Sequence, residues 1–212
     1  KRLRPLTNEI PKPLVKIKGK PLIQYNIDLL VAAGIKEILI NGYYKFDKLQ
    51  SYISSLNYDN IELKLIKEDE RLETGGGLKN AINYTDSQHI LTCNSDVILD
   101  NFKANPAQSL IQKWHGEDAE ILMLLSHKNN IIGYSGSGDY SLSESEIIRN
   151  KDNNDYIFTG LEIINSNIIN NIDKKVFSLS EIFNNCLLKK TLKAIIFEGS
   201  CIHVGDETGL NL

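Results

Sequence analysis

The chain opens with the stretch KRLRPLTNEIPKPL, residues 1–14, in which the cations Arg2 and Lys12 stand among three prolines. Each proline fixes φ, removes a backbone N–H and biases the residue before it toward an extended conformation. We therefore expect a stiff arm that forms neither a regular helix nor a central strand. Cations held in such an arm suit phosphate, because Arg forks onto two oxygens and Lys acts as a point charge. The alternative is an ordinary solvated basic terminus.

Beyond this arm, the residues up to 126 alternate between strand and helix patterns. Apolar spacing predicts strands at 37–41, 61–65, 89–93 and 119–125, and helices at 21–33, 46–53, 76–84 and 106–115. This alternation predicts an α/β fold with a mostly parallel central sheet flanked by helices. Ligands of such sheets bind beyond the carboxyl ends of the strands.

The remaining residues change in character but show no sign of a second domain. Residues 129–154 are polar and carry three glycines, which indicates short strands and turns. Strands are predicted at 156–164, 192–197 and 201–204, and the sequence Ser-Leu-Ser-Glu at 178–181 predicts a capping box that begins a helix. Because no repeat and no long linker is visible, we expect a single domain spanning 1–212.

Composition excludes several classes of protein. The net charge is −3 and the pI about 5.9, so duplex nucleic acid is a poor candidate partner. The 3 cysteines are scattered without a Cys-x-x-Cys pair, which argues against a zinc ribbon or a disulfide framework and suggests a reducing, cytoplasmic location. No apolar run approaches the ~20 residues of a membrane span, so we expect no membrane association.

A glycine run forms the second notable motif, Leu72-Glu73-Thr74-Gly75-Gly76-Gly77. Glycines ahead of a helix allow close backbone approach and leave helix N–H groups free for a ligand. The run is not a P-loop, because no Gly-Lys-Ser/Thr follows. Taken alone, such a run is more often only a turn.

Two further motifs follow predicted strands or lie within them. In Asn94-Ser95-Asp96, a carboxylate at the carboxyl end of a strand is well placed to hold Mg²⁺ between phosphates. An Asx turn that caps the strand is the simpler alternative. Phe158-Thr159-Gly160-Leu161-Glu162 is typical of a strand with a bulge.

Together these motifs resemble the sugar-1-phosphate nucleotidyltransferases, the NDP-sugar pyrophosphorylases. Residues 2–7 and 11–14 match the family signature Gly-x-Gly-x-Arg, Leu/Met-x-Pro-Leu-Thr and Pro-Lys-Pro, except that both glycines are absent. The string at 72–81 is similar to the base-binding loop of bacterial N-acetylmuramate-1-phosphate uridylyltransferases and mannose-1-phosphate guanylyltransferases. The resemblance implies a Rossmann-like fold of the glycosyltransferase-A type, with a nucleotide-binding half at 1–126 and a sugar-binding half at 127–212.

The resemblance also implies a reaction and a set of site residues. A sugar-1-phosphate oxygen attacks the α-phosphorus of a nucleoside triphosphate and pyrophosphate leaves, with UTP and an amino-sugar-1-phosphate or GTP and mannose-1-phosphate as the substrates. Arg2, Lys12 and Asp96 are expected to be catalytic, with Asp96 and either His203 or Asp206 holding Mg²⁺. The expected nucleotide-binding residues are Glu73, Thr74, Gly75, Gly76 and Asn94, and the expected sugar-binding residues are Thr159, Gly160 and Glu162.

Three departures from the family pattern leave alternatives open. His203 stands where the family has a metal-binding Asp, and imidazole suits Mn²⁺ better than Mg²⁺. Ser95 replaces a Gly. A strand and a Gly-x-Gly turn are expected ahead of Lys1, and the chain as printed should not be competent for catalysis without them. The alternatives are a non-catalytic paralogue that binds nucleotide or sugar phosphate, and a plain interaction domain. For the oligomeric state we expect a monomer or a small homo-oligomer.

Overall fold

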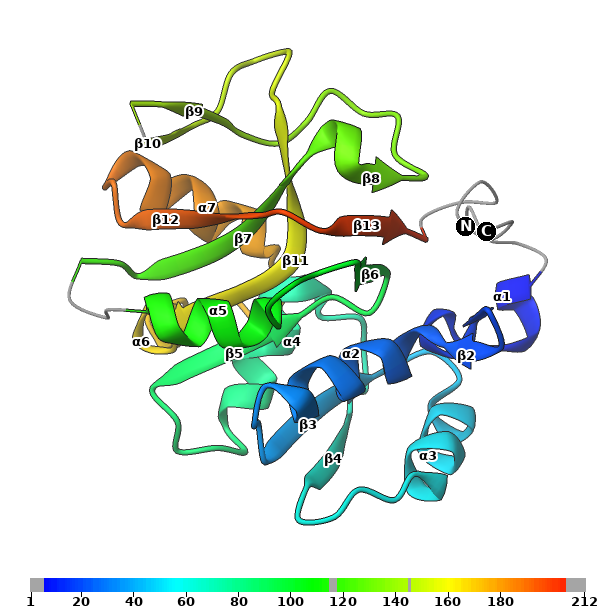
Figure 1. Cartoon of the computed structure of the whole chain (residues 1–212). Helices are drawn as coiled ribbons and strands as arrows, with labels where there is room; N and C mark the ends of the chain where they lie inside the picture. Colours follow the sequence, from blue (N-terminus) through cyan, green and yellow to red (C-terminus); the bar gives the residue numbers. More distant parts are fainter. Residues whose placement is uncertain (1–5, 115–117, 145, 205–212) are drawn as a thin grey trace.

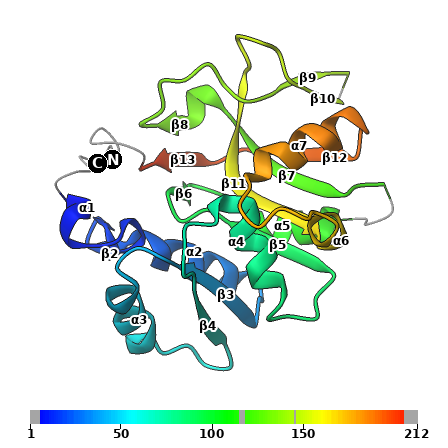
Figure 2. The same cartoon turned by 180° about the vertical axis from the view of Figure 1, so that it is seen from behind.

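A computed structural model describes residues 6–114, 118–144 and 146–204 (Figures 1 and 2). Within these ranges the helices are α1 (Leu6–Glu9), η1 (Lys12–Leu14), α2 (Leu22–Ala32), α3 (Phe46–Ser55), α4 (Glu73–Ile82), α5 (Pro106–Lys113), η2 (Lys128–Asn130), α6 (Asn167–Asn170) and α7 (Leu179–Leu188). The strands are β1 (Lys16–Ile17), β2 (Lys20–Pro21), β3 (Glu37–Gly42), β4 (Glu62–Lys67), β5 (His89–Cys93), β6 (Val97–Asp100), β7 (Ile121–His127), β8 (Ile131–Ile132), β9 (Ser141–Ser143), β10 (Glu146–Ile148), β11 (Tyr156–Asn165), β12 (Leu192–Phe197) and β13 (Ser200–His203).

A four-stranded sheet in the order β12-β7-β11-β5 forms the centre of the molecule. β12 pairs parallel with β7, whereas β11 pairs antiparallel with both β7 and β5. β5, β7 and β12 therefore share one direction and β11 is reversed, which confirms the expected α/β class with a single reversal. β3 and β4 form a separate parallel pair. Among the described strands, β5 has no partner on its second edge.

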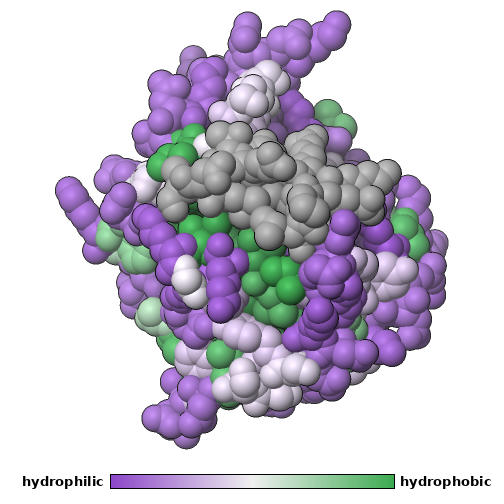
Figure 3. Space-filling view, turned by 90° about the vertical axis from the view of Figure 1, so that its right-hand side faces the viewer, coloured by the Kyte–Doolittle hydropathy of each residue, from purple (hydrophilic) through white to green (hydrophobic). Residues whose placement is uncertain are grey.

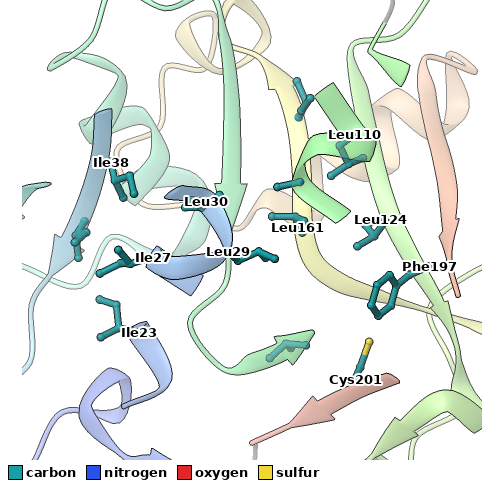
Figure 4. Packing of buried hydrophobic residues seen from close by; sticks show 14 of the residues in the cluster. Ile23, Ile27, Leu29, Leu30, Ile38, Leu110, Leu124, Leu161, Phe197 and Cys201 are labelled. Carbon is teal, nitrogen blue, oxygen red and sulfur yellow. The ribbon is translucent and has the colours of Figure 1, made fainter. Parts of the chain in front are cut away.

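Helices cover both faces of this sheet, and strand β7 shows why. Its residues Leu122 and Leu124 pack in one hydrophobic cluster with α2 and α5, while Ile121, Met123 and Leu125 pack in a second cluster with α4 and α7. Alternate residues of a strand point to opposite faces, so a strand that is apolar throughout needs a cover on each side. Figure 4 shows the first cluster, in which Leu29 and Leu30 of α2 and Leu110 of α5 approach Leu124 and Leu161.

Most predicted helices and strands are present, but two expectations are wrong. The N-terminal arm contains a short α-helix, α1, and the 3-10 helix η1, because Pro11 occupies the N-cap of η1 and Pro13 lies in its first turn, where proline is tolerated. α4 begins at Glu73, so the glycines lie inside its first turns instead of ahead of the helix. The capping box at α7 is only half formed, because Glu181 pairs with Lys174.

Candidate active site

Several of the predicted site residues lie at the carboxyl end of β5. A cavity of about 210 Å³ lies there. Its lining comes from the β5–β6 turn, the β8–β9 loop, the start of β11 and the end of β13: Asn94, Asp96, Val97, Ile131, Tyr134, Asp139, Ile157, Phe158, Thr159, Cys201 and His203. Figure 3 looks onto the side of the molecule where α1 and β13 lie, and hydrophobic residues show at the centre of this face among hydrophilic ones.

A larger hollow lies at the opposite end of the sheet. It measures about 580 Å³, is more open, and is lined mainly by polar residues around the starts of β7 and β12, such as Glu120 and Lys193. None of the predicted site residues that the structure describes belongs to its lining. The smaller cavity is therefore the better candidate site, because only it combines shape with the predicted chemistry.

An ion pair between Lys12 and Asp96 marks the edge of the cavity. Lys12 Nζ donates to Asp96 Oδ2 at 2.8 Å, and each side chain is about one-third exposed, 33% and 34%. The 3-10 turn holds the lysine, since Val15 N–H donates to Lys12 O at 3.0 Å. The backbone oxygen of Asp96 accepts from Val204 N–H at 2.9 Å, which ties the β5–β6 turn to the end of β13. The structure thus brings the basic arm to the strand-end carboxylate.

Gly160 shapes the other side of the turn. Its φ is +83°, and the register of β11 against β7 shifts between Phe158 and Glu162. Asn94 N–H donates to Gly160 O at 2.8 Å, and a Cβ on Gly160 would stand only 2.6 Å from Asn94 Cβ. The bulge therefore depends on glycine, both for its backbone angle and for the close approach of Asn94.

The neighbouring Thr159 and Glu162 differ in how they relate to the cavity. Thr159 lines it, although its hydroxyl donates to Leu124 O at 2.9 Å. Glu162 is fully buried and lies outside the lining, with Oε1 accepting from Thr92 Oγ1 at 3.1 Å. Glu162 Oε2 has no hydrogen-bond partner among the described residues. Its carboxyl group lies in the protein interior and does not meet the cavity in this structure, and the expected contact of Glu162 with a sugar remains a prediction.

The glycines of α4 are packed, not open. The N–H groups of Gly75 and Gly76 both donate to Phe177 O, at 2.9 and 3.2 Å. A Cβ on Gly76 would lie 2.2 Å from Lys175 O, and one on Gly75 would lie 2.3 Å from the Phe177 ring. The expectation that these N–H groups stay free for a ligand is wrong, because the segment 173–178 covers them.

Two other residues of this motif lie at the exposed start of α4. Glu73 has a left-handed backbone conformation, with φ at +61°, and its side chain is exposed. Thr74 Oγ1 accepts from Leu179 N–H at 3.1 Å. A nucleotide-binding role for both residues remains a prediction.

Comparison with known proteins decides the family. The family model described as "Nucleotidyl transferase" matches residues 1–134, which is more than half of the chain. The chain belongs to the nucleotidyl transferase family.

Individual relatives span most of this nucleotidyl transferase. It is 28% identical over 211 residues to an N-acetylmuramate alpha-1-phosphate uridylyltransferase of Caulobacter vibrioides, covering 97% of this chain and 87% of that protein. It is 30% identical over 219 residues to a mannose-1-phosphate guanyltransferase of Gibberella zeae, again over 97% of this chain. This chain covers only 58% of the Gibberella protein.

Solved structures share the fold. HddC from Yersinia pseudotuberculosis, complexed with GMP-PN, superposes with a TM-score of 0.78 at 23% identity, covering 99% of this chain and 91% of that one. The inositol-1-phosphate CTP transferase from T. maritima gives a TM-score of 0.79 at 16% identity, covering 99% and 86%. Separately, no helix in the described part of the chain is long and apolar enough to cross a membrane.

The metal-binding expectation can be tested on the donor set of this nucleotidyl transferase. Asp96 and His203 line the same cavity, and the Tyr134 ring meets the His203 ring edge-on with centroids 6.3 Å apart. No three His, Cys, Asp or Glu residues in the described ranges are close enough to hold a metal ion together. Mg²⁺ commonly takes only one or two carboxylates and fills its remaining positions with water and phosphate. Asp96, at the carboxyl end of β5, fits that mode of binding as one such carboxylate.

Two of the predicted site residues, Arg2 and Asp206, lie outside the described residues. Burial, and then the charge of Asp96, raise the pKa of Cys93 to about 12, so that thiol stays uncharged near the site.

Sequence reasoning missed Tyr134 and Asp139, which line the cavity from the β8–β9 loop. The only signal was Gly138 beside Asp139 in a polar stretch, which indicates a turn and no more.

Proposed function

We propose that this protein transfers a nucleotidyl group from a nucleoside triphosphate to a sugar-1-phosphate, giving an NDP-sugar and pyrophosphate. The observation that carries the proposal is the contact between Lys12 and Asp96, 84 positions apart in sequence, at a cavity beyond the end of β5. Family membership and the names of the relatives supply the reaction type. UTP and GTP are the two triphosphates that these names suggest.

Positioning and charge neutralisation would perform this chemistry. An oxygen of the sugar-1-phosphate attacks the α-phosphorus, the bond to the β-phosphate oxygen breaks, and pyrophosphate leaves with that electron pair. The attacking oxygen is already anionic, so the protein need not supply a general base. Lys12 would lie beside the reacting phosphates, where a fixed positive charge stabilises the charge that develops in the transition state.

Asp96 would be the anchor for a divalent cation, for which we propose Mg²⁺. Its Oδ2 is bound to Lys12, which leaves Oδ1 for the cation. The cation, when bound, would neutralise phosphate charge. His203 faces the same cavity and is the second proposed ligand, with Asp206 as the alternative. Arg2 would hold the leaving phosphates.

A substrate panel tests the proposal. Each of the four common nucleoside triphosphates is combined with mannose-1-phosphate and with N-acetylated amino-sugar-1-phosphates, in the presence of Mg²⁺, and pyrophosphate release is measured. We expect turnover with UTP or GTP when the assay uses a full-length form of the protein. Asp96→Asn should abolish most of it, because the substitution removes the anionic ligand of the cation.

The matched control is Asp100→Asn, at the exposed far end of β6. It should retain activity. If no pair of substrates releases pyrophosphate while nucleotide still binds, the protein is a non-catalytic nucleotide-binding relative. If Asp96→Asn turns over like the wild type, the assignment of the metal site is overturned.

A further inference from the structure

The side chain of Asp139 is held in place at the cavity by the backbone around it. Its Oδ2 accepts the Phe158 N–H at 3.0 Å, directly beside Thr159 on β11. Its own N–H donates to Tyr156 O at 2.8 Å, and its backbone oxygen accepts from Arg149 Nε at 3.3 Å. Three hydrogen bonds thus set the position of this carboxylate, which is only partly exposed.

The second carboxylate oxygen, Oδ1, is not used by the protein. No hydrogen bond or ion pair to Asp139 Oδ1 is made by any residue in the described ranges. The guanidinium of Arg149 contacts the backbone of Asp139 through Nε but forms no ion pair with its carboxylate, because Nη1 donates to Asn184 Oδ1 at 2.7 Å and Nη2 to the Tyr140 hydroxyl at 3.2 Å. The cavity is therefore lined by a carboxylate that has one oxygen without a partner among the described residues.

The two carboxylates that line the cavity differ in whether a cationic side chain balances their charge. Asp96 is neutralised by Lys12, whereas Asp139 has no cationic partner among the described residues. No Lys or Arg belongs to the described lining. A carboxylate on the sugar would meet Asp139 away from Lys12 and from the cation proposed at Asp96, both of which the phosphate would engage, and like charges brought together out of water repel strongly. A hydroxyl group would instead donate a charge-assisted hydrogen bond.

The size of the cavity limits what can enter. At about 210 Å³ it is smaller than the roughly 300–1,000 Å³ of pockets for drug-sized ligands. It therefore suits a single ring. With the phosphate beside Lys12 and Asp96, that ring would extend toward Asp139.

We propose that Asp139 is a specificity-determining residue that accepts a hydrogen bond from a ring hydroxyl of a neutral sugar-1-phosphate and disfavours sugars that carry a carboxylate. This inference rests on the proposed function. The names of the relatives suggest two sugar classes, the acidic N-acetylmuramate-1-phosphate and the neutral mannose-1-phosphate. The proposed role of Asp139 favours the neutral class.

The first test compares neutral sugars with an acidic one. N-acetylmuramate-1-phosphate carries a lactyl ether in place of the 3-hydroxyl of N-acetylglucosamine-1-phosphate, so the two differ by a carboxylate and by that one hydroxyl, and mannose-1-phosphate adds a second neutral sugar. We expect a higher kcat/KM for the neutral sugars in the wild type. A wild type that prefers N-acetylmuramate-1-phosphate would overturn the proposal.

The second test uses Asp139→Asn. The amide oxygen of the new asparagine can still accept a hydrogen bond from Phe158 N–H, but its amino group cannot accept one from a sugar hydroxyl. We expect KM for the neutral sugar-1-phosphate to rise roughly 10–100-fold with KM for the triphosphate unchanged, and the preference over the acidic sugar to shrink. Sugar analogues that each lack one hydroxyl identify the hydroxyl that contacts Asp139. For the analogue that lacks this hydroxyl, Asp139→Asn should cause no further increase in KM. An unchanged KM for the sugar would overturn the proposal.

Controls separate this inference from the proposed function. Asp152→Asn changes an exposed acid in the β10–β11 connection and should leave both KM values unchanged. Binding of the three sugar-1-phosphates is also measured by calorimetry, with and without triphosphate. Binding of neutral sugars that weakens in Asp139→Asn supports the proposal even if no turnover occurs, in which case only the proposed function fails. Absence of any binding by neutral sugars overturns it.

Discussion

At the scale of single residues, the ion pair of Lys12 with Asp96 combines two roles that can be separated. As a contact between side chains that are 33% and 34% exposed, it should contribute at most about 1 kcal/mol to stability. As a charge aimed at phosphate, Lys12 should be worth far more in the transition state than in the ground state.

Lys12→Ala should therefore lower kcat by about 10²–10³-fold, with a smaller change in KM for the triphosphate. The melting temperature should fall by less than about 4 °C. Steady-state pyrophosphate release and thermal unfolding measure the two effects. Lys16→Ala, in exposed β1, is the control and should match the wild type. A change confined to KM would make Lys12 a ground-state binder.

Glu162 makes a prediction about pH. Burial raises the pKa of Glu162 to about 8, although the hydrogen bond from Thr92 opposes the shift. Between the ordinary pKa of 4.5 and this raised value, the folded protein keeps a proton that the unfolded chain has released. Stability is therefore lost as the pH rises through this window, by at most about 1.4 kcal/mol per pH unit.

Glu162→Gln removes this ionisation while keeping the size and the acceptor for Thr92. Urea unfolding at pH 5, 6, 7 and 8 (roughly spanning the window between the two pKa values) should show the variant gaining stability relative to the wild type as the pH rises. Glu62→Gln, on the exposed side of β4, should show no such trend. A constant difference between Glu162→Gln and the wild type would mean that the native carboxyl group is already ionised at pH 5.

At the scale of elements, the segment 173–178 lies against the start of α4 and joins the two parts of the chain. Besides the bonds from Gly75 and Gly76 to Phe177 O, Lys175 forms an ion pair with Glu70. The glycines are needed because the backbone of this segment occupies the space where a Cβ would stand. The contact fixes the helix that carries Glu73 and Thr74.

Gly76→Ala should therefore destabilise the protein by about 1–3 kcal/mol, despite the better helix propensity of alanine. The new Cβ would lie 2.2 Å from the backbone oxygen of Lys175, which cannot move alone. Gly77→Ala is the matched control in the same helix, because its Cβ would meet only the ends of the Asn41 and Glu68 side chains. The free energy of unfolding in urea should be lower for Gly76→Ala than for the wild type and close to the wild-type value for Gly77→Ala. Equal stabilities of the two variants would contradict the packing of Gly76 against Lys175.

This contact also shows what could be predicted from sequence and what could not. Periodicity identified α2, β5 and β12 nearly to the residue, because the apolar pattern of each is a direct consequence of its packing face. A glycine run has the same appearance whether its open face meets a ligand or a distant backbone. The covering segment lies about 100 residues away, so nothing local indicated it.

The candidate site divides in the same way. The meeting of Lys12 with Asp96, beside Asn94, could be predicted because these residues occupy a distinctive arm and a strand end, while their catalytic and binding roles remain a proposal. Asp139 could not, because its importance comes from the bulge in β11 that presents the Phe158 N–H to it. The position of Glu162 outside the cavity has a related cause, because the register of β11 shifts between Phe158, which lines the cavity, and Glu162, which does not.

At the scale of the whole molecule, the two halves inferred from sequence do not have separate cores. One hydrophobic cluster joins Ile27 and Leu30 of the first half to Phe197 of the second. The other joins Leu78 of α4 to Ile164 of β11. Since an independent domain has a core of its own, we expect residues 1–212 to unfold as one unit. That outcome is not automatic, because two-state unfolding is usual mainly below about 150 residues.

The single tryptophan, Trp114, makes this expectation testable. Trp114 packs against the first cluster, whereas Ile164 is fully buried in the second. Ile164→Ala should cost about 2–5 kcal/mol through the cavity that it leaves. If the clusters unfold together, tryptophan fluorescence and far-UV circular dichroism should report one shared urea midpoint, and both should fall equally in the variant. Leu188→Ala, at a side chain that is 85% exposed, should leave the midpoint unchanged. A tryptophan midpoint unmoved by Ile164→Ala, while the circular dichroism midpoint falls, would mean that the two clusters unfold separately and would contradict unfolding as one unit.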